Sequence, residues 1–119
     1  MSKTATPKEF VINIGGRDFT MRERNGSRSD QFEELADEAI LIQEKKKSLD
    51  PTDIDGKRSL RKESRSCDCR CYRLLLDPVD KAPLTDEWIM ENIGSGFLEH
   101  EIMPIQAQLD NHQDVLGKN

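Results

Sequence analysis

The C-terminal part of the chain carries the clearest pattern of apolar and polar positions. Six residues recur at spacings of four, three, four, three and four: Leu98, Ile102, Ile105, Leu109, His112 and Leu116. This spacing predicts a helix with a single apolar stripe, because polar side chains fill its other faces. Pro104 lies inside this helix and is expected to kink it near His100, since proline lacks a backbone donor and crowds the carbonyl four residues earlier.

Near the N-terminus the apolar residues recur at every second position. Residues 10–14 and 18–24 both show this alternation, which predicts two β-strands. The pair Gly15-Gly16 between them predicts a tight turn, because glycine readily adopts the positive φ angles of hairpin turns. The sequence therefore predicts a β-hairpin. Two strands alone are marginally stable in water, so this hairpin must pack on a helix or on another chain.

The next apolar residues follow a helical rhythm. They are Phe32, Leu35, Ala36, Ala39, Ile40 and Ile42. Asp30 and Glu33 have the spacing of a capping box. Acidic side chains crowd the first half of this stretch and three lysines end it, which complements the helix dipole. We therefore expect a helix from about residue 30 to residue 47.

The middle of the chain interrupts this pattern. Residues 50–66 are strongly charged and contain few apolar side chains, so they are expected to form a flexible basic insert. Residues 69–76 are apolar again, but this run is too short to distinguish a helix from a strand. Thr85 is a favourable N-cap for a further short helix that ends near Gly94.

Together these elements predict an α+β fold that is mainly α: an N-terminal β-hairpin packed against three to four helices, with a flexible basic loop in the middle. We expect one small domain over residues 1–119, with residues 1–8 as a frayed tail. Hydrophobic residues make up only 34% of the chain, against about 45–50% in typical globular proteins. The core should therefore be thin, and part of the chain is expected to become ordered on a partner.

The net charge of −5 is divided into blocks of alternating sign. Residues 1–29 carry +3, residues 30–56 carry −6, residues 57–73 carry +5 and residues 74–119 carry −7. Such blocks favour complementary docking between protein surfaces. A nucleic-acid partner for residues 57–73 is not expected, because the isoelectric point near 5.1 is far below the value of about 9 typical of nucleic-acid-binding domains.

The sequence predicts a cytoplasmic protein without a membrane partner. Its first residues are polar, and no apolar run approaches the ~18 residues that span a bilayer. Its cysteines are only three, Cys67, Cys69 and Cys71, which is not a disulfide framework. They are interpreted as buried thiols and not as zinc ligands recruiting His100 or His112, because structural zinc sites pair cysteines at wider spacings. No metal, cofactor or catalytic site is expected.

A family resemblance rests on three segments of the sequence. They are FVINIGGRDFTMRERN near the N-terminus, LTDEWIMENI around Trp88-Ile89, and IMPIQAQLD over 102–110. With the acidic helix between them, their order resembles that of the tail assembly chaperones of long-tailed bacteriophages. In that family a glycine-containing hairpin precedes helices, and a Trp-Ile segment is followed by a helix with an Ile-x-x-Gln-x-x-Leu-like pattern. The resemblance leaves the middle of the chain and its cysteines unexplained.

The resemblance implies a non-enzymatic assembly chaperone or adaptor in the host cytoplasm. Such proteins mask the apolar helices of the tape measure protein, recruit tail tube subunits, tend to self-associate, and leave the finished particle. An apolar stripe shared between the core and a partner groove would suit this role. The residues expected to contact the partner are Trp88, Ile89, Leu98, Ile102, Ile105 and Leu109, with Trp88 as the main energetic anchor.

Two alternative functions remain open from the sequence. The first is a structural subunit of a phage tail or head–tail connector, which would stay in the virion. The second is a small regulator that binds metal or nucleic acid through residues 57–73. Proteomics of purified particles separates the first from a chaperone, and metal analysis with a salt titration against DNA tests the second.

Overall fold

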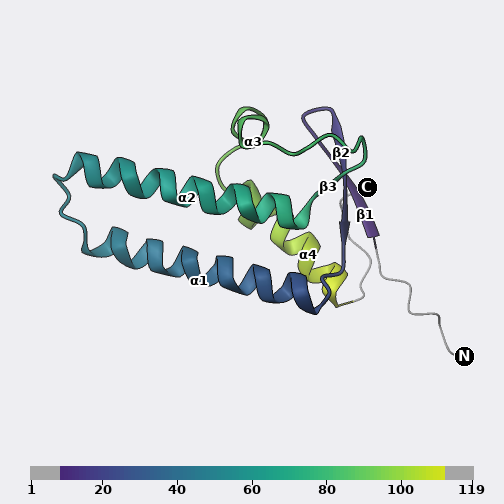
Figure 1. The fold of residues 1–119 in the computed structure, drawn as a ribbon, viewed down its shortest axis with the longest axis horizontal. Helices are drawn as coiled ribbons and strands as arrows, with labels where there is room; N and C mark the ends of the chain where they lie inside the picture. Colours follow the sequence, from purple (N-terminus) through teal and green to yellow (C-terminus); the bar gives the residue numbers. More distant parts are fainter. Residues whose placement is uncertain (1–8, 112–119) are drawn as a thin grey trace, which may run out of the picture. The chain divides into compact units, whose positions relative to one another are not determined.

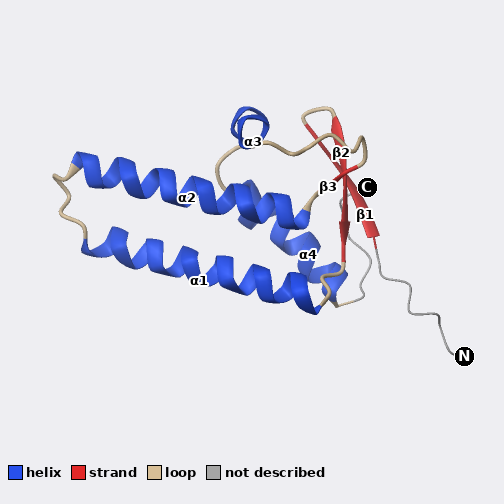
Figure 2. Ribbon diagram, in the orientation of Figure 1, coloured by secondary structure: helices blue, strands red, loops and turns tan. Residues whose placement is uncertain are grey.

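The structure is a computed structural model that describes residues 9–111 (Figure 1). The predicted frayed tail at residues 1–8 and the stripe positions His112 and Leu116 lie outside the described residues. The fold is α+β and mainly α, as the sequence predicts (Figure 2). The chain divides into two compact units, whereas one domain is expected from the sequence. Among the described residues, 9–25 and 75–111 form the unit that we call the sheet unit, and 26–74 form the hairpin unit.

The sheet unit begins with the predicted β-hairpin. β1 (Glu9–Ile14) pairs antiparallel with β2 (Arg17–Arg22), and β2 pairs on its other side with the two-residue strand β3 (Asp77–Pro78). The sheet order is therefore β1-β2-β3. The turn glycines, Gly15 and Gly16, both have positive φ angles, +60° and +80°. These angles match a two-residue hairpin turn whose twist suits the flanking strands, so the predicted hairpin is confirmed.

Helices follow the sheet within the same unit. They are α3 (Asp86–Asn92), the π-helical turn η1 (Leu98–Ile102) and α4 (Met103–Asp110). α3 begins at the predicted N-cap, where the Thr85 hydroxyl accepts a hydrogen bond from the Trp88 amide at 3.1 Å. α4 contacts β2. The Gln106 side chain fixes this contact by donating from Nε2 to the Arg22 carbonyl at 2.7 Å and to the Asp110 carboxylate at 2.9 Å.

The irregularity expected near His100 takes the form of the π-turn η1. Here the Met103 amide bonds to the Leu98 carbonyl, five residues back, instead of to the carbonyl four residues back. Pro104, which follows, has no amide hydrogen to donate, and it occupies the first turn of α4. Ile102 and Met103 both have right-handed helical angles, so the backbone stays helical from η1 into α4. The expected irregularity is therefore a π-turn within a continuous helical stretch, directly before the proline that cannot donate.

The hairpin unit consists of two long antiparallel helices, α1 (Gly26–Ser48) and α2 (Ile54–Leu75), which run side by side in Figure 1. α1 confirms the predicted helix and begins four residues earlier than expected. The Arg70 guanidinium pairs with the Glu38 carboxylate between the two helices. A second pair, Lys45 Nζ to Glu63 Oε1 at 3.7 Å, lies nearer the connecting loop.

The prediction of a flexible insert over 50–66 is wrong, because α2 occupies most of this range. Asp53 is the N-cap of α2, and its carboxylate accepts a hydrogen bond from the Gly56 amide at 2.9 Å. In the loop before it, Asp50 accepts bonds from both the amide and the hydroxyl of Thr52, at 2.9 and 2.8 Å. The many charges of this segment therefore lie on the outer faces of a capped helix.

None of the helices within residues 9–111 combines the length and the apolar character that crossing a bilayer requires.

Candidate protein-binding surfaces

The structure buries most of the apolar stripe that the sequence assigns to a partner. Ile89, Ile102, Ile105 and Leu109 are all buried, the last three almost completely. Trp88 and Leu98 are half-buried. The expectation of an available stripe along Ile89, Ile102, Ile105 and Leu109 is therefore wrong for the protomer as folded. The physical reason is that a small sheet needs an apolar helix face to cover it, and α4 supplies that face to β2.

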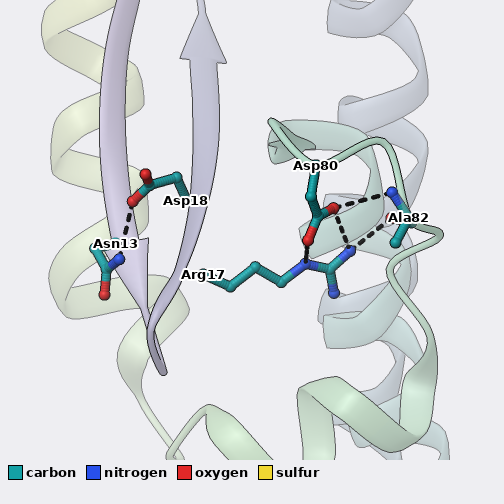
Figure 3. Close-up of polar contacts among 5 residues, drawn as sticks. All are labelled: Asn13, Arg17, Asp18, Asp80 and Ala82. Carbon is teal, nitrogen blue, oxygen red and sulfur yellow. Dashed lines mark hydrogen bonds and ion pairs between the residues drawn. The ribbon is translucent and has the colours of Figure 1, made fainter.

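Trp88 takes part in a structural cluster. Its ring meets the Phe19 ring edge-on, with 5.4 Å between centroids, and the Arg17 guanidinium lies 5.2 Å from each centroid. Arg17 also donates from Nε to Asp80 at 3.0 Å and from Nη2 to the Ala82 carbonyl at 2.5 Å (Figure 3). Arg17 thus ties β2 to the segment after β3, with Trp88 packed against it.

The hairpin unit carries exposed apolar side chains that the sequence analysis did not single out. Ile40 and Leu41, consecutive residues of α1, are 58% and 63% exposed, whereas their neighbour Ile42 is buried. Asp37 and Glu44 lie one turn before and after them and are also exposed. We call Asp37, Ile40, Leu41 and Glu44 the α1 patch. The signal was present in the sequence, because the apolar residues of this helix cover more than one face.

A pocket of about 450 Å³ lies where the two helices meet their connecting loop. It is lined by residues from the end of α1, from the loop and from the first turns of α2. They are Lys46, Lys47, Leu49, Pro51, Lys57, Leu60 and Arg61. We call this the tip pocket. Its lining combines apolar side chains with four cationic ones, and every one of these residues belongs to the hairpin unit.

The three cysteines are buried thiols of α2. The Cys67 Sγ lies 3.5 Å from the Leu35 carbonyl of α1, to which it donates. Burial raises the pKa of Cys67, and it raises the pKa of Cys71 to about 12. A thiol buried in this way packs as a small apolar side chain. Within the described residues no three His, Cys, Asp or Glu side chains are grouped to hold a metal ion.

The sequence analysis also considered two histidines as ligands. His100 lies exposed on η1, in the sheet unit, and His112 falls outside the described part of the chain.

Comparison of the chain with protein-family models, with curated proteins and with solved structures finds no match. Function must therefore be inferred from the surfaces of the molecule and from the pattern of its sequence.

Proposed function

We propose that this protein is a non-enzymatic assembly chaperone or adaptor that binds a helix of another protein along α1. The observation that carries the proposal is the exposure of Ile40 and Leu41 side by side on a long helix. Burying such side chains on a partner removes apolar surface from water, with a gain of ~25 cal/mol for each Å² covered. A partner helix with apolar residues at helical spacing would fit this surface.

The setting that we propose is phage tail morphogenesis, with the tape measure protein as the partner. The resemblance of the hairpin, the acidic helix and the Trp88 segment supports it. A tape measure protein presents long apolar helices that need a cover before the tail tube assembles around them. On this proposal α1 supplies the cover, in place of the stripe on α4 that the protomer uses in its own core.

The test is co-expression with a phage tape measure protein. We expect a complex and a gain in the soluble fraction of that partner. The double variant Ile40→Asp/Leu41→Asp should lose the complex, because it places two charges where apolar contact is needed. Failure of the unmodified chain to form any complex would overturn the proposed function.

A matched control is available on the same helix. Ser27→Asp/Gln31→Asp adds the same charge at exposed positions near the start of α1, at least about two turns before Ile40. It should bind as the unmodified chain does, and both variants should keep the helical circular dichroism signal. Equal loss of binding in the two variants would overturn the assignment to the α1 patch.

A further inference from the structure

We infer that the tip pocket binds an acidic peptide segment of a partner protein, with one apolar side chain of the peptide inserted between the cations. The pocket is distinct from the α1 patch. The inference holds whether or not the chain acts in tail assembly.

The shape and lining of the pocket suit such a segment. Leu49, Pro51 and Leu60 provide apolar contact, and Leu60 is itself buried beneath the surface. The volume of about 450 Å³ lies within the range of about 300–1,000 Å³ seen for ligand sites. The pocket is therefore large enough for a bulky aliphatic side chain together with part of the backbone that carries it.

Three of the four pocket cations form no ion pair within the described residues. Lys46, Lys57 and Arg61 make no ion pair there, whereas the neighbouring Lys45 pairs with Glu63. Lys47 has only an exposed contact of 3.5 Å with Glu44, one turn away. Like charges gathered around one pocket repel each other, and a ligand with carboxylates on both sides of its apolar residue would relieve that repulsion.

Two of the nearby carboxylates are engaged in hydrogen bonds of the loop. The Asp50 carboxylate accepts a hydrogen bond from the Thr52 hydroxyl, and the Asp53 carboxylate caps α2 by accepting one from the Gly56 amide. Residues 44–63, which include the ion-pair partners Glu44 and Glu63, contain seven cations and five carboxylates, so this end of the hairpin has a net charge of +2. An acidic ligand would therefore be attracted over distances of about a Debye length, which is ~8 Å at physiological salt.

The structure favours a peptide over a nucleic acid. Single-stranded nucleic acids bind by stacking their bases on exposed aromatic rings in addition to phosphate contacts. The basic segment 57–73 has one aromatic residue, Tyr72, and it is only 3% exposed. The tip pocket is lined instead by aliphatic side chains, which fit an apolar amino acid.

The experiment is a titration of the full chain with a short peptide that has a central leucine flanked on each side by two glutamates. Binding is followed by amide chemical shifts in ¹⁵N-labelled protein. We expect shifts centred on residues 46–61, and weaker binding as the salt concentration rises. A peptide with serine in place of the central leucine should bind at least about tenfold more weakly, which corresponds to ~1.4 kcal/mol. Absence of shifts, or equal binding of the serine peptide, would overturn the inference.

Two charge-reversal variants test whether the peptide binds in the tip pocket. Lys57→Glu/Arg61→Glu changes the pocket lining, whereas Arg58→Glu/Lys62→Glu makes the same change of charge at exposed positions of α2 outside that lining. Only the first should abolish binding of the leucine peptide. Equal loss in both would show attraction by net charge without a pocket. Tighter binding of a single-stranded oligonucleotide at the same salt concentration would overturn the choice of a peptide.

The proposed chaperone role and the proposed peptide site in the tip pocket can be disproved separately. The uncharged variant Ile40→Ser/Leu41→Ser removes the apolar contact without adding charge near Lys46 and Lys47, so it should bind the acidic peptide normally while losing the tape measure protein. Loss of both activities in that variant, with its helicity retained, would contradict two separate surfaces.

Discussion

At the scale of single residues, Arg17 makes the most varied set of contacts in the sheet unit. Its guanidinium lies near two aromatic rings and forms a fork with the Asp80 carboxylate (Figure 3). The Ala82 amide and Arg17 together hold the pKa of Asp80 below its usual range. A planar guanidinium combines stacking with paired donors, which the compact ammonium of lysine does not.

Arg17→Lys should therefore lower the free energy of unfolding by about 1–2 kcal/mol although the charge is kept. Urea denaturation measures this loss. Arg22→Lys is the comparison, because Arg22 pairs with Glu9 and Asp77 in a more exposed setting, with 36% of its side chain accessible. That change should cost less than about 1 kcal/mol. Equal costs would mean that the aromatic contacts of Arg17 contribute nothing.

The turn glycines make a second matched pair at this scale. Gly15 and Gly16 both have positive φ angles, so alanine at either position costs about 1–2 kcal/mol in backbone strain. A Cβ on Gly15 would also lie 2.8 Å from the Asn92 side-chain oxygen, whereas one on Gly16 would meet nothing within 4 Å. Gly15→Ala should thus lower the melting temperature more than Gly16→Ala. The reverse order would contradict the packing of the turn on Asn92.

The free energy of unfolding should depend on pH through the thiol of Cys71. Burial raises its pKa from 9.0 to about 12 in the folded chain. A group whose folded pKa is raised contributes its full stabilisation below the unfolded pKa, and this stabilisation is lost as the pH rises through the folded value. The free energy of unfolding should therefore fall between about pH 9 and pH 12. Cys71→Ala should show a shallower decline in the same titration, and an equal slope would contradict the burial of the thiol.

At the scale of elements, a loop was predicted where α2 lies, although the sequence contains the apolar stripe of this helix. Leu60, Cys67, Cys71 and Leu75 are buried and spaced by seven, four and four residues, which is a helical stripe. The predicted insert over residues 50–66 contains only Leu60 of this stripe, so its many charges suggested a loop, and the cysteines that continue the stripe lie just beyond it. Cysteine in a reduced chain packs as a small apolar residue. The β-hairpin and α1, whose patterns contain no such residues, were predicted correctly.

Within residues 9–111, β1 is an edge strand with no neighbour on its outer side, and this side offers a surface for the self-association that the resemblance implies. The Asp18 carbonyl accepts a bond from Val79, so alternate residues of β2 face away from β1. In β1, Ile14 lies opposite Arg17 next to the two-residue turn, and their backbone groups face each other. Because alternate residues of a strand point their backbone groups to opposite sides, those of Glu9, Val11 and Asn13 point away from β2. Such an edge is a template for another strand. We propose pairing with the same edge of a second copy, centred on Val11, which places Glu9 opposite Asn13.

Val11→Pro tests this pairing, because proline removes an amide that faces the edge and takes none from the β1–β2 ladder. We expect the unmodified chain to sediment as a concentration-dependent dimer or larger species, and the variant as a monomer with a similar melting temperature. Val11→Thr keeps the amide and a branched side chain, so it should associate normally. A chain that remains monomeric at all concentrations, or a proline variant that still associates, would contradict the proposal.

At the scale of the whole molecule, the order of the elements along the chain does not reveal how they group into the two units. The sheet unit takes residues from both ends of the sequence, and the helical hairpin is inserted between β2 and β3. β3 has only two residues, too few for any periodicity to reveal. The stripe on α4 was found from its spacing, but spacing does not tell whether a partner chain or the chain's own sheet covers it. The exposed α1 patch and the tip pocket became visible only with the burial of each residue.

The abundance of the protein in purified particles separates a chaperone from a structural subunit. A chaperone covers its partner during assembly and is then displaced, so it should be missing from purified tailed particles and abundant in the lysate. A structural subunit would copurify in fixed proportion to the tube protein. Quantitative proteomics of both fractions measures this ratio. The Ile40→Asp/Leu41→Asp variant adds a functional readout, because loss of the α1 contact should leave the tape measure protein insoluble and reduce the yield of tails. Normal tails with this variant, or the protein present in mature particles, would favour the structural role.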